Sequence, residues 1–208
     1  MEKRQLSEKS WLIILIWKDN DVKEKIILGI DPGTNIMGYG LLRINGNKAA
    51  LENMGAWDMR KINDPYLRLG RIFEQVTDVI CKYLPDEMAI EAPFFGKNVQ
   101  SMLKLGRSQG VAIAAAIHHN VPIYEYAPLK IKMAITGQGQ ASKEQVAGML
   151  KRILNIKDSQ MPHFMDATDA LGVAYCHFLQ RGKIESDVHY NNWKDFVRKN
   201  QERICKKL

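Results

Sequence analysis

Three strand-like segments precede the first helix-like segment of this 208-residue chain, and that order limits the possible folds more than any other feature. Residues 26–31 form a short apolar run that ends in an acid. Residues 37–45 and 49–58 have the pattern of two further strands, joined at an Asn-Gly turn that is typical of a hairpin. The three segments therefore predict an antiparallel meander.

Helices and single strands alternate after this meander. Apolar residues recur three and four positions apart between Pro65 and Tyr83, which predicts a helix. The later segments predict two strands, at 88–91 and 121–126, and three further helices, at 99–117, 142–155 and 167–179. A meander followed by crossover units gives an α/β fold with a mixed five-stranded sheet flanked by helices. This order of elements is that of the ribonuclease H-like fold.

The charge balance makes a polyanionic partner plausible. The chain is 46% hydrophobic and 25% charged, with a formal net charge of +7. Residues 97–152 are rich in Lys and Arg, whereas the rest of 26–180 is net acidic. Such segregation is what a phosphate-binding surface beside a carboxylate metal site would need. A basic protein with no nucleic-acid role is the alternative that charge alone leaves open.

We expect one domain over residues 25–180, an extension over 1–24 and a basic tail over 181–208. The apolar run at 11–17 has only seven residues, whereas a membrane span needs about 20, so no membrane partner and no signal peptide are expected. The cysteines share no CxxC spacing and are expected to be reduced thiols in a cytoplasmic protein: Cys81, Cys176 and Cys205.

Four carboxylates stand at the ends of predicted elements. Asp31 and Glu91 each end an apolar strand, and Asp166 and Asp169 lie three residues apart where the last helix begins, so they share one face. Converging carboxylates must bind a cation or shift their pKa values. Mg²⁺ prefers such hard oxygen ligands, and two ions about 4 Å apart can clamp a phosphodiester. The four acids therefore predict a magnesium-dependent site.

Each acid also has a simpler interpretation. Asp31 could merely initiate the Asp-Pro-Gly turn, and Glu91 could pair with a buried base. Asp166 could be the N-cap of the last helix, with Asp169 completing a capping-box-like arrangement. The weight of the metal-site hypothesis comes from finding all four acids on this order of elements.

Four sequence blocks together resemble the RuvC-type Holliday junction resolvases. IILGIDPGTNIMGYG, AIEAPFFGKN, LKLGRSQGVAIAAA and DATDALGVA match segments of that family in order and spacing, over about residues 26–180. By this resemblance Asp31, Glu91, Asp166 and Asp169 match the four catalytic, metal-binding acids. The implied cofactor is Mg²⁺, two ions in each active site, with Mn²⁺ as a substitute.

The resemblance also implies DNA-binding residues and partners. Phe94 matches an aromatic residue that stacks on a junction base, and Lys132 and Lys143 match lysines near the scissile phosphate. Lys97 lies in the basic stretch and is expected to contact DNA. The implied enzyme is a homodimeric crossover junction endodeoxyribonuclease of homologous recombination and DNA repair. It would make paired nicks in strands of like polarity of a four-way junction, beside the RuvA–RuvB branch-migration complex.

Simpler interpretations of these accessory residues stay open. Phe94 or Phe95 could be core residues, and Lys132 and Lys143 could be solvated surface charges. The helix at 99–117 carries Gly106, Gly110 and Ala114 four residues apart, a row that matches a region near the dimer interface of the family. This row could equally pack within the monomer.

Three other functions are weighed against this one. An actin-like ATPase or sugar kinase also carries an Ile-Asp-x-Gly-Thr turn, but it would need a second phosphate loop, and no second Asp-x-Gly occurs in the sequence. A junction-binding protein without catalysis would not need four acids beside a polyanion. A different ribonuclease H-like nuclease, acting on RNA–DNA hybrid or another branched DNA, is opposed only by the matched Phe94 loop.

Overall fold

The computed structural model describes residues 24–93, 98–161 and 164–184. The apolar run at 11–17 and most of the predicted tail lie outside the described residues. The chain divides into one unit that ends at Phe178 and a second that starts at Leu179. The fold described below is that of the first unit. No helix among the described residues is both long enough and apolar enough to cross a membrane.

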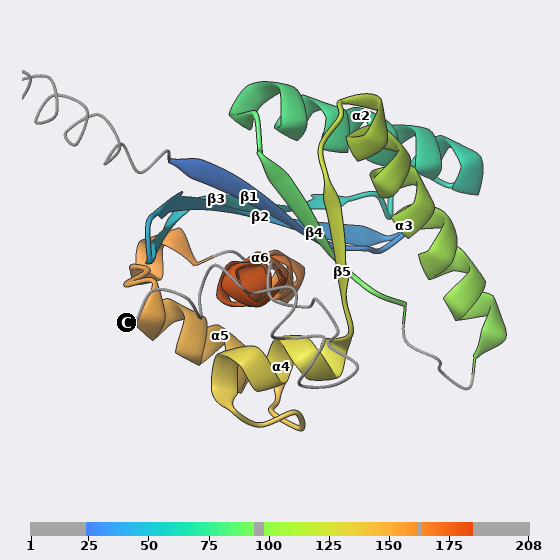
Figure 1. Cartoon of the computed structure of the whole chain (residues 1–208). Coiled ribbons are helices and arrows are strands. Elements are labelled where there is room, and N and C mark those ends of the chain that lie inside the picture. The colour runs from blue at the N-terminus through green and yellow to red at the C-terminus, as the bar shows by residue number, and fades with distance from the viewer. Residues whose placement is uncertain (1–23, 94–97, 162–163, 185–208) are drawn as a thin grey trace, which may run out of the picture. The chain divides into compact units, whose positions relative to one another are not determined.

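Five strands form one mixed sheet, as the sequence predicts (Figure 1). Their order across the sheet is β3-β2-β1-β4-β5. The strands are β1 (Lys25–Asp31), β2 (Ile36–Asn45), β3 (Lys48–Asp58), β4 (Glu87–Glu91) and β5 (Ile123–Tyr126). The first three pair antiparallel, which confirms the meander, and β4 pairs parallel with both β1 and β5. The carboxyl ends of β1, β3, β4 and β5 therefore all lie along the same edge of the sheet.

Helices cover both faces of this sheet (Figure 1). On one face lie α2 (Pro65–Tyr83) and α3 (Val99–His118), and on the other lie α4 (Pro128–Thr136), α5 (Lys143–Ile153) and α6 (Met165–Ile184). A short 3₁₀ helix, Asp158–Gln160, precedes α6. The side chain of Asp64 caps α2, and Ser142 and Gln145 form a capping box at the start of α5.

The helix α4 is the element that the sequence did not predict. It is a nine-residue helix that buries only Ile131 and Ile135, one turn apart, so its periodic signal is short. Two local signals mark its ends. Pro128 stands in its first turn, where the missing backbone N–H costs no hydrogen bond, and Gly137 ends it with a positive φ of 72°.

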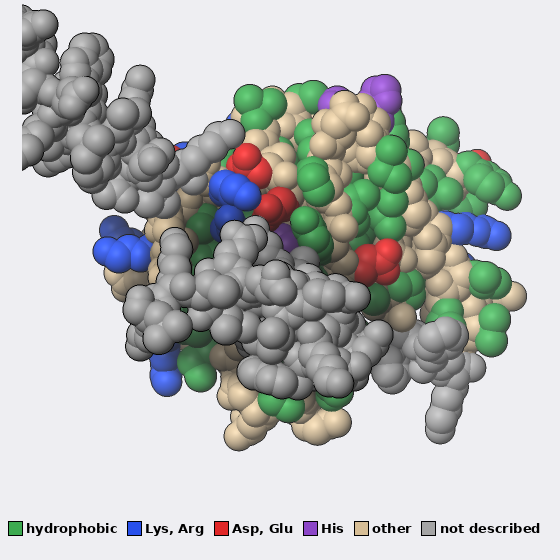
Figure 2. Space-filling view, in the orientation of Figure 1, with side chains coloured by type: hydrophobic (Ala, Val, Ile, Leu, Met, Phe, Trp, Pro, Cys, Tyr) green, Lys and Arg blue, Asp and Glu red, His purple; other side chains and the backbone are tan. Residues whose placement is uncertain are grey.

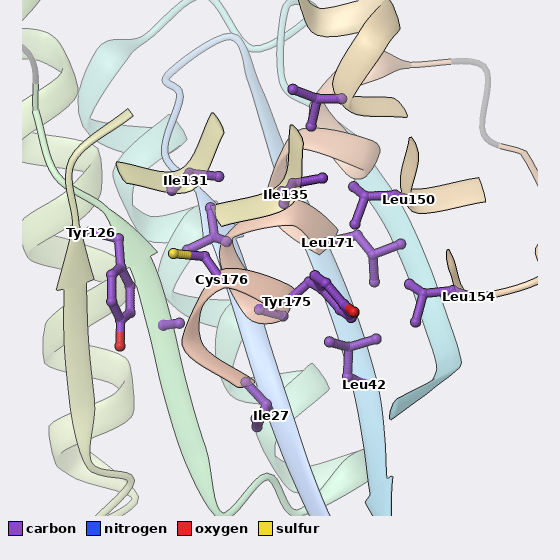
Figure 3. Close-up of a cluster of buried hydrophobic side chains, with 14 of the residues drawn as sticks. Ile27, Leu42, Tyr126, Ile131, Ile135, Leu150, Leu154, Leu171, Tyr175 and Cys176 are labelled. Atoms are coloured by element: carbon purple, nitrogen blue, oxygen red, sulfur yellow. The ribbon is translucent and has the colours of Figure 1, made fainter. Parts of the chain in front are cut away.

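Each face of the sheet has its own core cluster, because side chains alternate along a strand. On β1, Ile27 belongs to the cluster beneath α6, whereas Leu28 and Ile30 belong to the cluster beneath α2 and α3. Figure 3 shows the first of these clusters, with Leu171 of α6 near Leu42 of β2. The side-chain direction at the end of each strand is therefore fixed by the burial of the residues before it.

The first half of α6 lies directly on the backbone of the sheet. A Cβ atom on Gly29 would lie 2.1 Å from the carbonyl oxygen of Ala170, and one on Gly38 would lie 1.9 Å from that of Asp166. Neither distance is possible between real atoms, so only glycine permits this approach. The start of α6 is thereby held against the ends of β1 and β2 that meet at the same edge.

The predicted row of small residues on α3 does not pack within the described part of the chain. Gly106, Gly110 and Ala114 are exposed, and no described residue comes within 4 Å of where a Cβ would stand on either glycine. Leu103 and Ile117 on the same side of α3 are more than half exposed. Figure 2 shows hydrophobic side chains over α2 and α3. The row on α3 is therefore exposed with respect to the described residues, and the interpretation that it packs within the monomer is not supported.

Candidate active site

The predicted carboxylates converge at the edge where β1 and β4 end. Asp31 is the last residue of β1 and Glu91 the last of β4. Gly29 and Ala89, two residues earlier in each strand, face α6, and strand alternation points Asp31 and Glu91 the same way. Asp169 projects from the beginning of α6. The three acids line one hollow of about 90 Å³.

Two lysines complete the wall of this hollow. Lys132 comes from α4 and Lys143 from the first turn of α5. The Nζ of Lys143 forms an ion pair with Oδ2 of Asp169, whose side chain is only 14% exposed. Apolar side chains from the same two helices, Ile131 and Val146, close the remaining wall. The hollow therefore presents carboxylates and ammonium groups side by side.

Asp166 lies near the hollow without lining it. Its charge raises the pKa values of both Asp31 and Asp169, so the four carboxylates share one electrostatic site. Asp166 lies inside the first turn of α6, which begins at Met165. The interpretation of Asp166 as the N-cap is therefore wrong. No described residue forms a hydrogen bond to the carboxylate of Asp31, which does not support the turn-initiating role.

Burial and mutual repulsion perturb the acids strongly. Burial, followed by the charges of Glu91 and Asp169, raises the pKa of Asp31 to about 8. Burial, with the charge of Asp169 next, raises the pKa of Glu91 to about 7. Burial also raises the pKa of Asp169, although its ion pair with Lys143 opposes the shift. A cation between such acids would favour their ionised forms at neutral pH.

Lys143 supplies part of that positive charge. Burial alone would lower the pKa of Lys143, but its hydrogen bond to Asp169 and the nearby charges of Asp31 and Asp166 raise it overall. Glu91 has no ion pair with any described residue, so the interpretation of Glu91 as the partner of a buried base is not supported. Lys132 and Lys143 act on Glu91 only as nearby charges.

The donor atoms suit a hard divalent cation. Carboxylate oxygens are the ligands that Mg²⁺ and Mn²⁺ prefer, and three of them line the hollow. In the present side-chain positions, no three Asp, Glu, His or Cys residues of the described part are close enough together to hold a metal ion. The ion pair with Lys143 engages Asp169 in this arrangement. The carboxylates of Asp31, Glu91 and Asp169 therefore suit a divalent metal ion in their donor atoms and in their shared position at this edge of the sheet.

Other predicted residues divide into two groups. Phe94 and Lys97 lie outside the described residues, in the segment between β4 and α3. Lys132 and Lys143 both reach the hollow, although they come from different helices. The wall residues Pro128 and Ile131 were missed because the helix that carries them was missed, and Val146 was missed although its helix was predicted. The signal that could have found α4 is Pro128, directly after a strand, followed by Gly137.

The fold and this edge define a class: a protein of the ribonuclease H-like fold with a carboxylate site suited to metal-dependent phosphodiester chemistry. Residues 27–177 match the family model described as crossover junction endodeoxyribonuclease RuvC. The chain therefore belongs to the RuvC family of endonucleases, as the sequence blocks indicated. Membership of this family implies a divalent metal cofactor.

Relatives and solved structures agree with this assignment. The crossover junction endodeoxyribonuclease RuvC of Bacteroides fragilis is 64% identical over 183 residues, which cover 88% of this chain and 97% of the relative. That of Porphyromonas gingivalis is 57% identical over 185 residues, covering 88% and 98%. The structure of Thermus thermophilus RuvC in complex with Holliday junction substrate is 31% identical, with a TM-score of 0.70, covering 78% and 97%.

Proposed function

We propose that this endonuclease resolves four-way DNA junctions by hydrolysing one phosphodiester bond in each of two strands of like polarity. The observation that carries the proposal is the hollow in which Asp31, Glu91 and Asp169 meet two lysines at one edge of the sheet. The similarity to the Thermus thermophilus protein, whose structure includes Holliday junction substrate, supports the choice of DNA. Homologous recombination and DNA repair are the processes that this activity serves.

The four acids are proposed as the metal-binding and catalytic residues. Asp31, Glu91 and Asp169 supply the oxygen ligands that line the hollow, and Asp166 adds negative charge beside them. We propose two Mg²⁺ ions, with Mn²⁺ as a substitute. When bound, such ions activate water and stabilise the leaving oxygen. The carboxylates would hold these ions, and the apolar side chains of α4 and α5 limit the access of bulk water.

The lysines are proposed to hold the DNA at the scissile phosphate. Lys143 is 58% exposed at its side chain, so its ammonium group is reachable from solvent even while it pairs with Asp169. Lys132 has a position on the same wall. A phosphate that enters the hollow gives both lysines an anionic partner and leaves the carboxylates free for metal. Phe94 and Lys97, after Glu91, are proposed to contact the junction beside this phosphate.

The assembly follows from the need for two cuts. One active site cuts one strand at a time. Paired incisions therefore need a homodimer with one active site in each subunit. The open face of α3 along Gly106 and Gly110 supports a helix-to-helix contact. We further propose that the dimer acts in the cytoplasm beside the RuvA–RuvB complex. The nuclease domain spans 25–180, with 1–24 and 181–208 as appendages.

The test uses purified protein with labelled four-way junction, linear duplex and RNA–DNA hybrid, each with and without Mg²⁺. Symmetric nicks in two opposite arms of the junction, dependent on the metal and absent from the other substrates, are the expected result. Equal cleavage of the hybrid would assign the protein to a different nuclease activity. Binding of the junction without cleavage under any divalent metal would remove catalysis from the proposal.

A further inference from the structure

A second hollow, of about 390 Å³, opens on the opposite face of the sheet, between α2 and α3. Its walls come from the turn after β1, the segment after β3 and the two helices. The polar wall residues are Thr34, Asn35, Asn63, Arg68, Lys104 and Arg107. Among the described residues, the lining of this hollow thus has three cationic groups and no carboxylate.

The guanidinium group of Arg68 is held in place by the fold. Its Nε donates to the carbonyl oxygen of Ile62, and one Nη donates to the side-chain oxygen of Asn35. A guanidinium group has five N–H donors, so these two bonds orient it and leave the others available. Because Asn35 belongs to the turn that follows Asp31, this contact also fixes α2 against that turn.

Lys104 and Arg107 complete the charge of the hollow from α3. They lie three residues apart, so they share one side of the helix. Both are exposed, and neither forms an ion pair with another described residue. Uncompensated cations that converge with amide donors are suited to an anion, and a guanidinium fork is suited to phosphate oxygens in particular.

The two hollows lie at the same edge of the sheet, one on each face. Asp31 lines the carboxylate hollow, and Thr34, three residues later, lines the basic hollow. Three residues of extended chain span at most about 11 Å. One DNA strand advances by about 3.4 Å of helix axis per phosphate. A strand that passes over this edge can therefore reach both hollows within a few nucleotides.

We infer that the basic hollow of Arg68, Lys104 and Arg107 binds a backbone phosphate of the strand whose scissile phosphate enters the carboxylate hollow. This inference rests on the proposed function for the identity of the ligand as DNA. Holding the strand at two points on opposite faces fixes its direction across the edge. Such a contact contributes affinity that does not depend on base sequence.

The experiment measures junction affinity in Ca²⁺ over a range of salt concentrations for the Lys104→Gln, Arg107→Gln and double variants. Gln keeps most of the side-chain length and removes the charge. Each lost phosphate contact is expected to reduce the slope of log K against log salt by about 0.9. The double variant should bind more weakly to junctions of every sequence, with an unchanged melting temperature. Lys48→Gln, at the start of β3 beside the hairpin turn and at the other edge of the sheet, is the matched control and should behave as wild type.

Three results would overturn the inference. The double variant could keep the wild-type slope, or the Lys48→Gln control could lose as much slope as the double variant. Sedimentation could also show that the double variant is monomeric where the wild type is dimeric, in which case a second copy occupies the hollow. A wild-type protein that binds DNA but cuts no junction would instead refute the proposed function, and the slopes on linear duplex would still test the hollow.

Discussion

At the scale of single residues, the carboxylate hollow depends on charges that come from distant parts of the chain. The positions of Asp31 and Glu91 could be predicted, because each ends a strand whose burial pattern fixes the direction of its side chain. The ion pair of Lys143 with Asp169 could not be predicted from the residues alone, because it depends on how α5 packs beside α6. The family resemblance pointed to Lys143 without indicating this partner.

Asp31→Asn is expected to abolish cleavage while junction binding in Ca²⁺ stays within about threefold of wild type. The substitution removes a metal-binding oxygen and leaves the lysines in place. Nicking assays beside gel-shift titrations measure the two effects. Cleavage within about threefold of the wild-type rate would remove Asp31 from the mechanism.

The same variant also tests metal binding without DNA. Burial and the charges of Glu91 and Asp169 raise the pKa of Asp31 to about 8. The ionised form of Asp31 is therefore unfavourable in the metal-free protein. A raised acid pKa means that stability is lost as pH rises from the ordinary value of Asp towards 8. Asp31→Asn should therefore raise the metal-free melting temperature at pH 8. Added Mg²⁺ should raise the melting temperature of the wild type more than that of the variant.

Phe94→Ala is expected to slow junction cleavage by roughly ten- to a hundredfold. A ring that stacks on an unpaired base contributes about 1–3 kcal/mol, and about 1.4 kcal/mol is a factor of ten in rate. Single-turnover cleavage measures this effect, and a junction with a pre-opened crossover should recover part of the loss. Phe95→Ala is the matched control. A fall of several degrees in the melting temperature of Phe94→Ala would make the ring a core residue.

At the scale of elements, the five strands and four of the five α-helices of the described residues could be predicted, because their apolar patterns are long or have clear ends. The helix α4 could not, because it has too few buried positions to show a period. Its omission mattered for the site, since α4 carries Lys132 and part of the apolar wall. The close approach of α6 to the sheet could not be predicted either. The sequence contains Gly29 and Gly38, but it does not show that the backbone of α6 packs against them.

A buried polar chain also ties α6 to the sheet. Nε2 of His177 lies 3.0 Å from Oε2 of Glu87 on β4, and its Nδ1 lies 2.7 Å from the hydroxyl oxygen of Tyr126 on β5. Lys25 forms an ion pair with the other oxygen of Glu87 at 3.2 Å. Burial would raise the pKa of Glu87, but the hydrogen bonds from His177 and Lys25 outweigh it and lower the pKa.

Glu87→Gln is therefore expected to destabilise the fold by about 1–3 kcal/mol at pH 7, the usual range for removing a buried charged hydrogen-bond partner. A carboxyl whose pKa is lowered on folding stabilises the protein above its unfolded pKa, and the contribution is lost as pH falls through the folded pKa. The difference in unfolding free energy should thus shrink below about pH 4. Denaturant titrations at several pH values measure it.

A matched control separates this network from ordinary surface charge. Glu74 on α2 forms an exposed ion pair with Arg71, and Glu74→Gln should change the free energy of unfolding by less than about 1 kcal/mol at any pH. A pH-independent difference for Glu87→Gln would show that shape, and not the charge of the carboxylate, accounts for its effect.

At the scale of the whole molecule, the proposed dimer places the exposed side of α3, with Gly106 and Gly110, at the contact between subunits. Gly110→Leu is expected to convert a dimer into a monomer at tens of micromolar, because a large side chain would stand where a second backbone must approach. Sedimentation measures the assembly, and paired nicking of one junction should become two uncoupled single nicks. The variant should fold as well as wild type, because no atom of the described residues lies within 4 Å of a Cβ at this position.

Gly70→Leu on α2 provides the comparison for this prediction. Gly70 is also a helical glycine, and in the described part of the chain nothing lies within 4 Å of a Cβ there, so its replacement tests the general effect of an added leucine. It should remain dimeric. A wild-type protein that is monomeric at tens of micromolar would contradict the dimer altogether.

The alternation of side chains along β1 and β4 has a consequence for changes in chain length. One residue inserted between Ile27 and Asp31 would turn the carboxylate from the α6 face to the face of α2 and α3, and would also misplace the apolar residue beside it. An insertion in the hairpin between β2 and β3 would disturb neither. Insertions and deletions in β1 or β4 should therefore abolish cleavage. Changes of length in the turns at the far edge of the sheet should leave the active site unchanged.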